Sequence, residues 1–288
     1  MAKPKRENRI MDNRTQSFAD VSSYLKYIES APEHRSWSQI SPARHNQRDH
    51  DWDLGVGFQG AIDMARQGWQ AGVDKLQKIY KPVIPQGVAR TRAYSVAGHS
   101  PCIGRFLSGA PDCMNTRIFS DTNKKPVIDI TICPVAGSGV SGDNMLLFGA
   151  AIAEIIINLE ASGYAINIDA AMIIDASMTD VISGSFISLK KSNYPLDMSR
   201  LIYFMAHPSF LRRLGFADFT HKLEMNKDTS SSLGRVMDFD DVKAILPNKE
   251  SLIFCTNYDT MLNCTTSNAA RKTVSDIVRA QRPDLITD

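Results

Sequence analysis

A glycine-rich loop is the part of this sequence whose residue types and spacing come closest to a ligand site. Gly137, Gly139 and Gly142 match the pattern G-x-G-x-x-G between a predicted strand and a predicted helix. In that context, backbone amides and the N-terminus of the helix can hold a pyrophosphate. The loop therefore supports one functional hypothesis, a nucleotide- or S-adenosylmethionine-dependent enzyme.

Three features of the sequence count against this cofactor site. Residues 133–136 separate the predicted strand from the first glycine, where the fingerprint requires a tight turn. Asp143 would place a negative charge at the phosphate. The two strands after the helix are joined too briefly for a second strand–helix–strand unit. We therefore predict no bound cofactor and rank the enzyme hypothesis second.

Histidine and cysteine side chains are the next candidates for metal or nucleophilic chemistry. His99, Cys102 and Cys113 come closest to the spacing of zinc ligands, but a structural zinc site uses four ligands, usually in close pairs. Packed thiols and a hydrogen-bonded histidine are the favoured interpretation. Cys133 would be a nucleophile if the following helix lowered its pKa and a histidine lay beside it. The sequence places no histidine there, so we predict no catalytic residue and no metal site.

A cluster of titratable residues lies in a segment bounded by prolines. Such a cluster can bind a cation or act in acid–base catalysis. Polar residues in a loop of this kind are more often simply hydrated, which is the favoured interpretation. The members are His45, Asp49, His50, Asp51 and Asp53.

The N-terminal residues 1–16 are polar and basic and are predicted to form a flexible arm. Glu7 and Asp12 dilute the positive charge, so a solvated tail is favoured over an arm that binds nucleic acid. The nucleic-acid alternative would use Lys3, Lys5, Arg6, Arg9 and Arg14.

Composition limits the classes of protein. A chain of 288 residues can bury a substantial core, and a net charge of +2 does not indicate a nucleic-acid or membrane-surface protein. Five cysteines at irregular spacings favour free thiols in a reducing compartment. The N-terminus lacks the apolar segment of a secretory signal, and the apolar stretch 145–159 is shorter than the roughly 20 residues that span a bilayer. We expect a buried core helix there and no membrane partner.

The first half of the chain is predicted to be helical and then irregular. Apolar residues at helical spacing predict a helix with Ser17 as its N-cap, and two more helices over 58–66 and 70–80. Glycine, proline and serine interrupt residues 83–123, where we expect short strands in an irregular segment.

The second half is predicted to be a sheet flanked by helices. After a β-branched strand come a helix over 143–162 that starts at Asp143, two antiparallel strands, a helix over 197–214, a strand and a closing helix. This order predicts an α/β fold with a mixed, mostly parallel sheet and helices on both faces. The expected domains are a basic arm (1–16), a helical and irregular N-terminal region (17–123) and an α/β domain (124–288).

Two segments of the second half carry a family resemblance over residues 126–281. The run VIDITICPVAGSGVSGDNMLLFGAAIAEIIINLEASGYAINIDAAM and the later SLIFCTNYDT are similar to a von Willebrand factor A-type domain. The first run resembles its first strand, metal loop, first helix and second strand. Such domains usually bind a divalent cation through an Asp-x-Ser-x-Ser loop. Cys133, Val135 and Gly137 stand at those positions, so the resemblance implies a Rossmann-like fold without the usual metal-site motif.

Three further segments resemble a group of uncharacterised proteins encoded by tailed bacteriophages. The segments are DWDLGVGFQGAIDMARQGW, AYSVAGHSPCIGRFLSGAPDCM and PLDMSRLIYFMAHPSFLRRLGF. In that group a helical N-terminal region precedes a von Willebrand A-like half. The resemblance implies a phage-encoded protein in the cytoplasm of the infected host cell, and it implies no activity.

These observations rank a non-enzymatic binding or adaptor protein first. Ligands of open α/β sheets bind outside the carboxyl ends of the strands, so we expect a macromolecular partner at that loop edge. The von Willebrand A resemblance suggests a protein partner, with an ATPase motor as one class. Nucleic-acid binding through the basic arm is the third hypothesis. The predicted partner-binding residues are Ser138, Ser141, Asp143, Asn257 and Asp259.

Overall fold

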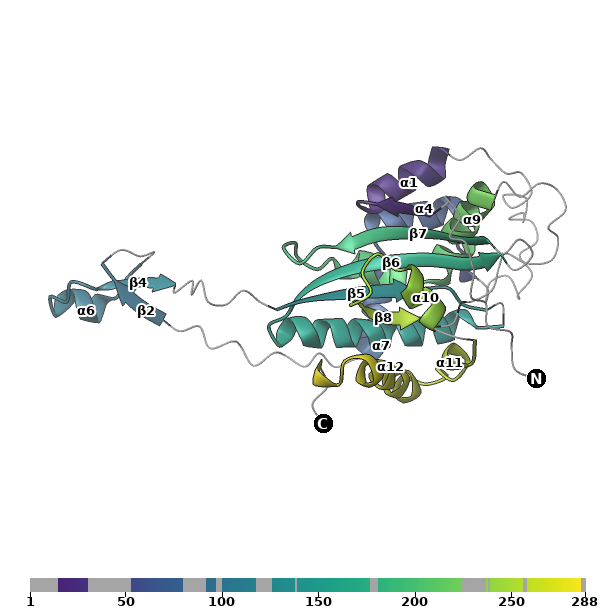
Figure 1. The fold of residues 1–288 in the computed structure, drawn as a ribbon. Helices are drawn as coiled ribbons and strands as arrows, with labels where there is room; N and C mark the ends of the chain where they lie inside the picture. Colours follow the sequence, from purple (N-terminus) through teal and green to yellow (C-terminus); the bar gives the residue numbers. More distant parts are fainter. Residues whose placement is uncertain are drawn as a thin grey trace.

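The fold of the 288-residue chain is given by a computed structural model. The structure describes residues 15–30, 53–79, 92–96, 100–117, 126–137, 139–176, 181–223, 237, 239–255 and 258–285. These residues form a five-stranded sheet with helices around it and a separate three-stranded sheet (Figure 1).

The main sheet has the strand order β1-β7-β6-β5-β8. Its strands are β1 (Gln16–Phe18), β5 (Val127–Cys133), β6 (Ala165–Ala176), β7 (Val181–Lys190) and β8 (Leu252–Cys255). The pairs β1/β7, β5/β6 and β5/β8 are parallel, and the pair β6/β7 is antiparallel. The predicted α/β class, the mixed and mostly parallel sheet and the antiparallel β6/β7 pair are therefore confirmed.

Helices cover one face of this sheet. α7 (Gly142–Ala161) lies along the sheet, and α8 (Met198–Ala206) and α12 (Ser267–Gln281) pack against α7 (Figure 1). α7 and α8 approach so closely that a Cβ on Gly149 would lie 2.6 Å from the Met205 carbonyl oxygen. α7 is the described helix whose length and composition would suit a membrane span, but 56% of its most apolar window is buried inside the protein, as expected of a core helix.

The opposite face of the sheet carries a smaller apolar cluster beneath α10 (Phe239–Ile245). Cys133 and Ile253 face this cluster, whereas Ile130 and Ile132 face the larger core. This alternation is expected, because successive side chains of a strand point to opposite faces of the sheet. Helices therefore lie on both faces.

The N-terminal helices share the larger core. α1 (Val21–Ser30), α4 (Phe58–Gln67) and α5 (Gln70–Ile79) bury apolar residues, including Tyr24, Ile62 and Leu76, in the same cluster as the sheet.

The start of α1 corrects one prediction. Ser17 is not an N-cap, because it lies in β1 opposite Phe186 of β7. The Asp20 carboxylate instead accepts a hydrogen bond from the backbone N–H of Ser23 at 2.7 Å. Pairing with β7 satisfies the backbone groups of β1, so the helix begins later than the apolar pattern suggested.

The single helix predicted over 197–214 is also wrong, because the chain forms two elements there. α8 ends at Ala206, and a π-helix, Phe210–Gly215, leads into α9 (Phe216–Leu223). Pro208 explains the break, since proline has no N–H to donate and its ring clashes with the preceding turn.

The three-stranded sheet lies apart from the main body (Figure 1). β4 (Met114–Arg117) pairs antiparallel with β2 (Arg92–Ser95) and with β3 (Ser100–Pro101), and α6 (Ile103–Leu107) connects β3 to β4. We call the described residues 92–96 and 100–117 the outlying module. Its short strands lie within the segment where short strands were expected.

Candidate functional site

The carboxyl ends of β5 and β8 lie side by side, with Cys133 paired in register with Cys255. The chain leaves β5 through α7 toward β6, whereas β8 lies on the other side of β5. In open α/β sheets, ligands bind outside the carboxyl ends of neighbouring strands whose following connections run to opposite sides of the sheet. We call the described residues 134–137 and 139–143 together with α11 (Tyr258–Leu262) the loop edge.

Side chains fix the start of α7 at the loop edge. Ser141 is the N-cap, and its hydroxyl oxygen accepts a hydrogen bond from the backbone N–H of Asn144 at 3.1 Å. The side-chain amide of Asn144 donates to the carbonyl oxygens of Met261 and Leu262, each at 3.2 Å. Because these carbonyls belong to α11, one asparagine connects the two helices of the loop edge.

A buried guanidinium supports the glycine loop. Arg212 lies in the π-helix, is 4% exposed, and donates through Nη2 to the Val140 carbonyl oxygen at 2.5 Å. Loss of hydration lowers the pKa of Arg212 to about 10, and Asp53 opposes this decrease. Arg212 therefore remains charged at neutral pH, and the loop has a fixed positive charge behind it.

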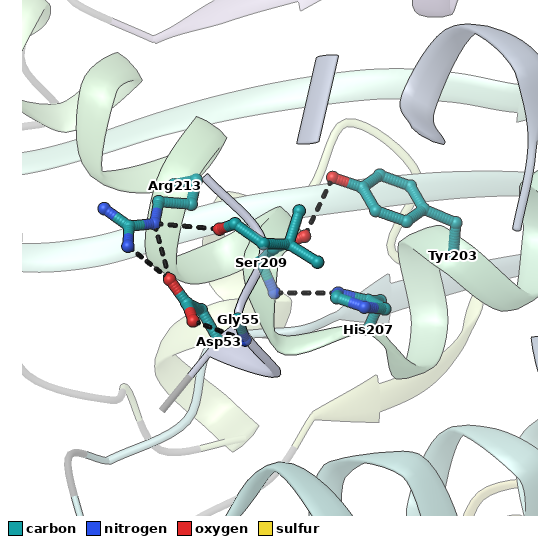
Figure 2. A network of polar contacts seen from close by, with 7 residues as sticks. Asp53, Gly55, Tyr203, His207, Ser209 and Arg213 are labelled. Atoms are coloured by element: carbon teal, nitrogen blue, oxygen red, sulfur yellow. Dashed lines mark hydrogen bonds and ion pairs between the residues drawn. The ribbon is translucent and has the colours of Figure 1, made fainter. Parts of the chain in front are cut away.

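Arg213 connects the same π-helix to the segment before α4 (Figure 2). It forms an ion pair with the fully buried carboxylate of Asp53, to which Nε donates at 2.7 Å. Nε also donates to the Val56 carbonyl oxygen at 3.2 Å. The second Asp53 oxygen accepts the backbone N–H of Gly55 at 2.9 Å. Neighbouring arginines thus hold two different segments.

A second group of buried polar contacts lies where α8 ends (Figure 2). The Tyr203 hydroxyl donates to the Ala61 carbonyl oxygen at 2.9 Å and lies 3.3 Å from the Ser209 hydroxyl. The backbone N–H of Ser209 donates to Nδ1 of His207 at 3.1 Å. Burial, with a smaller contribution from Lys75, lowers the pKa of His207 to about 4, so its ring is neutral at pH 7.

These contacts do not form a catalytic serine–histidine pair. A nucleophilic serine directs its hydroxyl at the base. Here His207 accepts from the backbone N–H of Ser209, and the Ser209 hydroxyl contacts Tyr203 instead. Both Ser209 and His207 are buried. The network therefore stabilises the connection between α8 and the π-helix.

The three glycines of the predicted cofactor loop lie in different environments. Gly139 is exposed, Gly137 is half-buried, and Gly142 is buried as the first residue of α7. None of these three described glycines has a positive φ. β5, α7 and β6 form one strand–helix–strand unit, and β7 then returns antiparallel.

The structure locates part of the predicted partner-binding set. Ser141 and Asp143 are both exposed, and Asp259 lies in α11, which Asn144 joins to α7. The helix does not start at Asp143, because Ser141 supplies the cap and Asp143 lies in the first turn. Ser138 and Asn257 lie outside the described residues.

The positions of the von Willebrand A metal motif do not fit a hard cation. Cys133 and Val135 are buried, and Gly137 has no side chain, whereas Mg²⁺ takes oxygen ligands. Cys133 is not an activated thiol either, because a hydrogen bond with Cys255 and burial raise its pKa well above the usual value. Within the described ranges, no three His, Cys, Asp or Glu side chains gather as metal ligands.

Other predicted site residues fall outside the described part of the chain. These are the basic residues Lys3, Lys5, Arg6, Arg9 and Arg14, and His45, Asp49, His50 and Asp51 of the titratable cluster. Asp53 is the described member of that cluster. It is buried and paired with Arg213, so the prediction of a hydrated side chain is wrong for this residue.

The sequence analysis missed Asn144, Arg212 and Arg213. Arg212 is buried and Arg213 is mostly buried, although arginine side chains are usually exposed. The signal that could have found them is Pro208, which ends α8 and changes the direction of the residues that follow. Nothing in the local pattern marks Asn144.

Residues 5–282 match the family described as a domain of unknown function (DUF7192). No curated protein and no solved structure matches the chain.

Proposed function

The chain belongs to the DUF7192 family over nearly its whole length, and we propose that it is a non-enzymatic binding or adaptor protein. In this proposal a macromolecular partner is recognised at the loop edge. The observation that carries it is the way the loop edge is held. Asn144 and Arg212 fix its backbone from inside, while Ser141 and Asp143 remain exposed. A fixed backbone with exposed polar groups suits recognition, because little conformational entropy is lost on binding.

The proposed partner is a protein that presents cationic groups. Asp143 is exposed at the start of α7, and Asp259 lies in the adjoining α11. An exposed carboxylate at this edge is complementary to arginine or lysine side chains of a partner. Resemblance to von Willebrand A domains suggests an ATPase motor as the class of partner.

We further propose that the protein is phage-encoded. In this proposal its metal-free von Willebrand A-like domain acts in the cytoplasm of the infected host cell. Support comes from β5, α7 and β6, which are a strand, a helix and a parallel strand where the resemblance expects them. Further support comes from Cys133 and Val135, whose side chains do not suit the metal that such domains usually hold.

Affinity capture with loop-edge variants tests the proposal. The tagged full-length protein and its D143A/D259A variant are incubated with extract of phage-infected cells, with and without nuclease, and the retained proteins are identified by mass spectrometry. We expect a nuclease-resistant protein whose recovery falls at least about tenfold in D143A/D259A, equivalent to about 1.4 kcal/mol of binding. D74A, which changes an exposed carboxylate on α5, is the matched control and should retain the partner.

Two outcomes would contradict this function. Full recovery of the partner by a folded D143A/D259A protein would exclude the loop edge as its binding surface. Loss of all retained material after nuclease treatment would move nucleic-acid binding by the basic arm to first place.

A further inference from the structure

The outlying module exposes an unusual amount of apolar surface. Within the described residues, it holds most of the exposed large apolar side chains, including Val96 (75% exposed), Ile103 (71%), Phe106 (64%) and Leu107 (78%). A unit of this size cannot bury enough apolar area to be stable by itself, and such units usually rely on a disulfide, a metal or a partner chain.

Two cysteines of the outlying module are neighbours in space. β3 and β4 pair Ser100 with Asn115 and Pro101 with Met114, and the next step of this register brings Cys102 opposite Cys113. The backbone N–H of Cys102 donates to the Cys113 carbonyl oxygen at 2.7 Å. Opposite residues of an antiparallel pair project from the same face, so this register assigns the two free, half-exposed cysteines to one face.

The spacing of this pair suits a shared metal better than a disulfide. Opposite residues of an antiparallel pair have Cβ atoms roughly 4.5–5.5 Å apart, whereas a disulfide brings the Cβ atoms to roughly 3.8 Å. Two thiolates on one tetrahedral zinc, each with a Zn–S bond of about 2.3 Å, keep their sulfurs well apart. The two thiolates can therefore bind one metal ion without a change in the positions of the strands.

We infer that Cys102 and Cys113 form half of a tetrahedral zinc site, and that the same two residues of a second copy of the chain complete it. A four-cysteine site is a common structural zinc centre. A twofold axis through the metal would relate the two modules, as in most homodimers.

The surroundings of the thiols suit contact with an identical surface. Ile103, Phe106 and Leu107 lie on α6, directly after Cys102, and a second module would cover them. Beside the pair, Arg105 donates to the Asp112 carboxylate at 2.5 Å. One positive and one negative group on the same surface can face their own copies without net repulsion.

Arg105 follows Cys102 by three residues. Its guanidinium lies 4.6 Å from the centre of the Tyr94 ring. Each thiol releases its proton to solvent as it binds the metal, so four thiolates on one Zn²⁺ leave two negative charges. Arg105 of each copy, which is paired with Asp112, would lie near this charge without cancelling it.

Zinc titration of the reduced, metal-free full-length protein tests this inference. Light scattering after size-exclusion chromatography measures the mass, and Co²⁺ in place of Zn²⁺ reports thiolate ligands through its charge-transfer absorption. We expect a dimer with one metal per two chains, which a chelator returns to monomer.

Variants separate the metal from the apolar contact. C102S and C113S should each lose the cobalt absorption and the zinc-dependent dimer, whereas C255S, which removes a partly exposed thiol elsewhere, should keep both. L107E should weaken the dimer while circular dichroism stays unchanged. One zinc per monomeric chain, zinc binding that survives C102S/C113S, or no zinc binding by the folded protein would each overturn the inference.

Discussion

Arg212 donates to the carbonyl oxygen of Val140, and this contact joins the π-helix to the glycine loop. The next residue, Arg213, pairs with Asp53 in the segment before α4. Two adjacent arginines therefore connect three segments that are distant in sequence. Each connection can be tested separately, because each arginine contacts a different segment.

Removing the Arg212 contact should destabilise the protein. Arg212→Met keeps an unbranched apolar chain in the site but leaves the Val140 carbonyl without its buried donor, so we expect the free energy of unfolding to fall by about 2 kcal/mol. Urea denaturation measures this change. R200M, at a side chain that is 49% exposed, should change the free energy by less than about 0.5 kcal/mol. Equal values for the two variants would show that the contact adds no stability.

Asp53 and Arg213 should show strong energetic coupling. Asp53→Ala leaves a mostly buried guanidinium without its carboxylate, and Arg213→Met leaves a fully buried carboxylate, so each should cost about 3 kcal/mol. The double variant should cost at least about 1 kcal/mol less than the sum, because neither residue of the pair then leaves the other unpaired. Simple additivity in the double-mutant cycle would argue against the pair.

His207 should reduce stability in mild acid. Burial lowers its pKa from 6.5 to about 4, so between these values the unfolded chain binds a proton that the folded chain does not. Above pH 6.5 the His207 ring is neutral in both states and does not change the free energy of unfolding with pH. As the pH decreases to 4, the free energy of unfolding falls by about 3 kcal/mol. Unfolding measured across this range would detect it. In His207→Asn, where Oδ1 can still accept from Ser209, this part of the pH dependence should disappear; a profile like that of the wild type would assign it to other groups.

The glycine loop should not bind a cofactor if the chain is a binding protein. A panel of nucleotides and S-adenosylmethionine should leave the melting temperature unchanged, whereas a ligand at one hundred times its Kd would stabilise the fold by about 2.7 kcal/mol. Thermal unfolding in the presence of each compound provides the measurement. A stabilisation that Gly139→Asp abolishes would instead favour the enzyme hypothesis, and the exposed position of Gly139 makes this substitution compatible with folding.

The central elements were predictable because their signals are local. The β-branched run of β5 and the short connection between β6 and β7 specify a buried strand and an antiparallel pair from neighbouring residues alone. β1 was missed, because residues 16–18 are a strand only through their pairing with β7. The break at Pro208 was missed because the apolar spacing continues across it.

The candidate site was predictable only at its surface. Loop residues after a strand are expected to be exposed, and Ser141 and Asp143 are. Contacts made over long sequence distances, such as Asn144 with α11 and Arg212 with Val140, leave no periodic signal. The pairing of Cys102 with Cys113 depends in the same way on a register that spacing does not reveal.

The position of β1 has a consequence for synthesis of the chain. Gln16 is among the first described residues, yet its strand partner is Ser185. On the ribosome, β1 and the apolar face of α1 must therefore wait until β7 has been made. Pairings between residues so far apart in sequence slow folding. Until β7 is available, the exposed β1 and the apolar face of α1 can aggregate or bind chaperones. The nascent chain should be most dependent on chaperones during this interval.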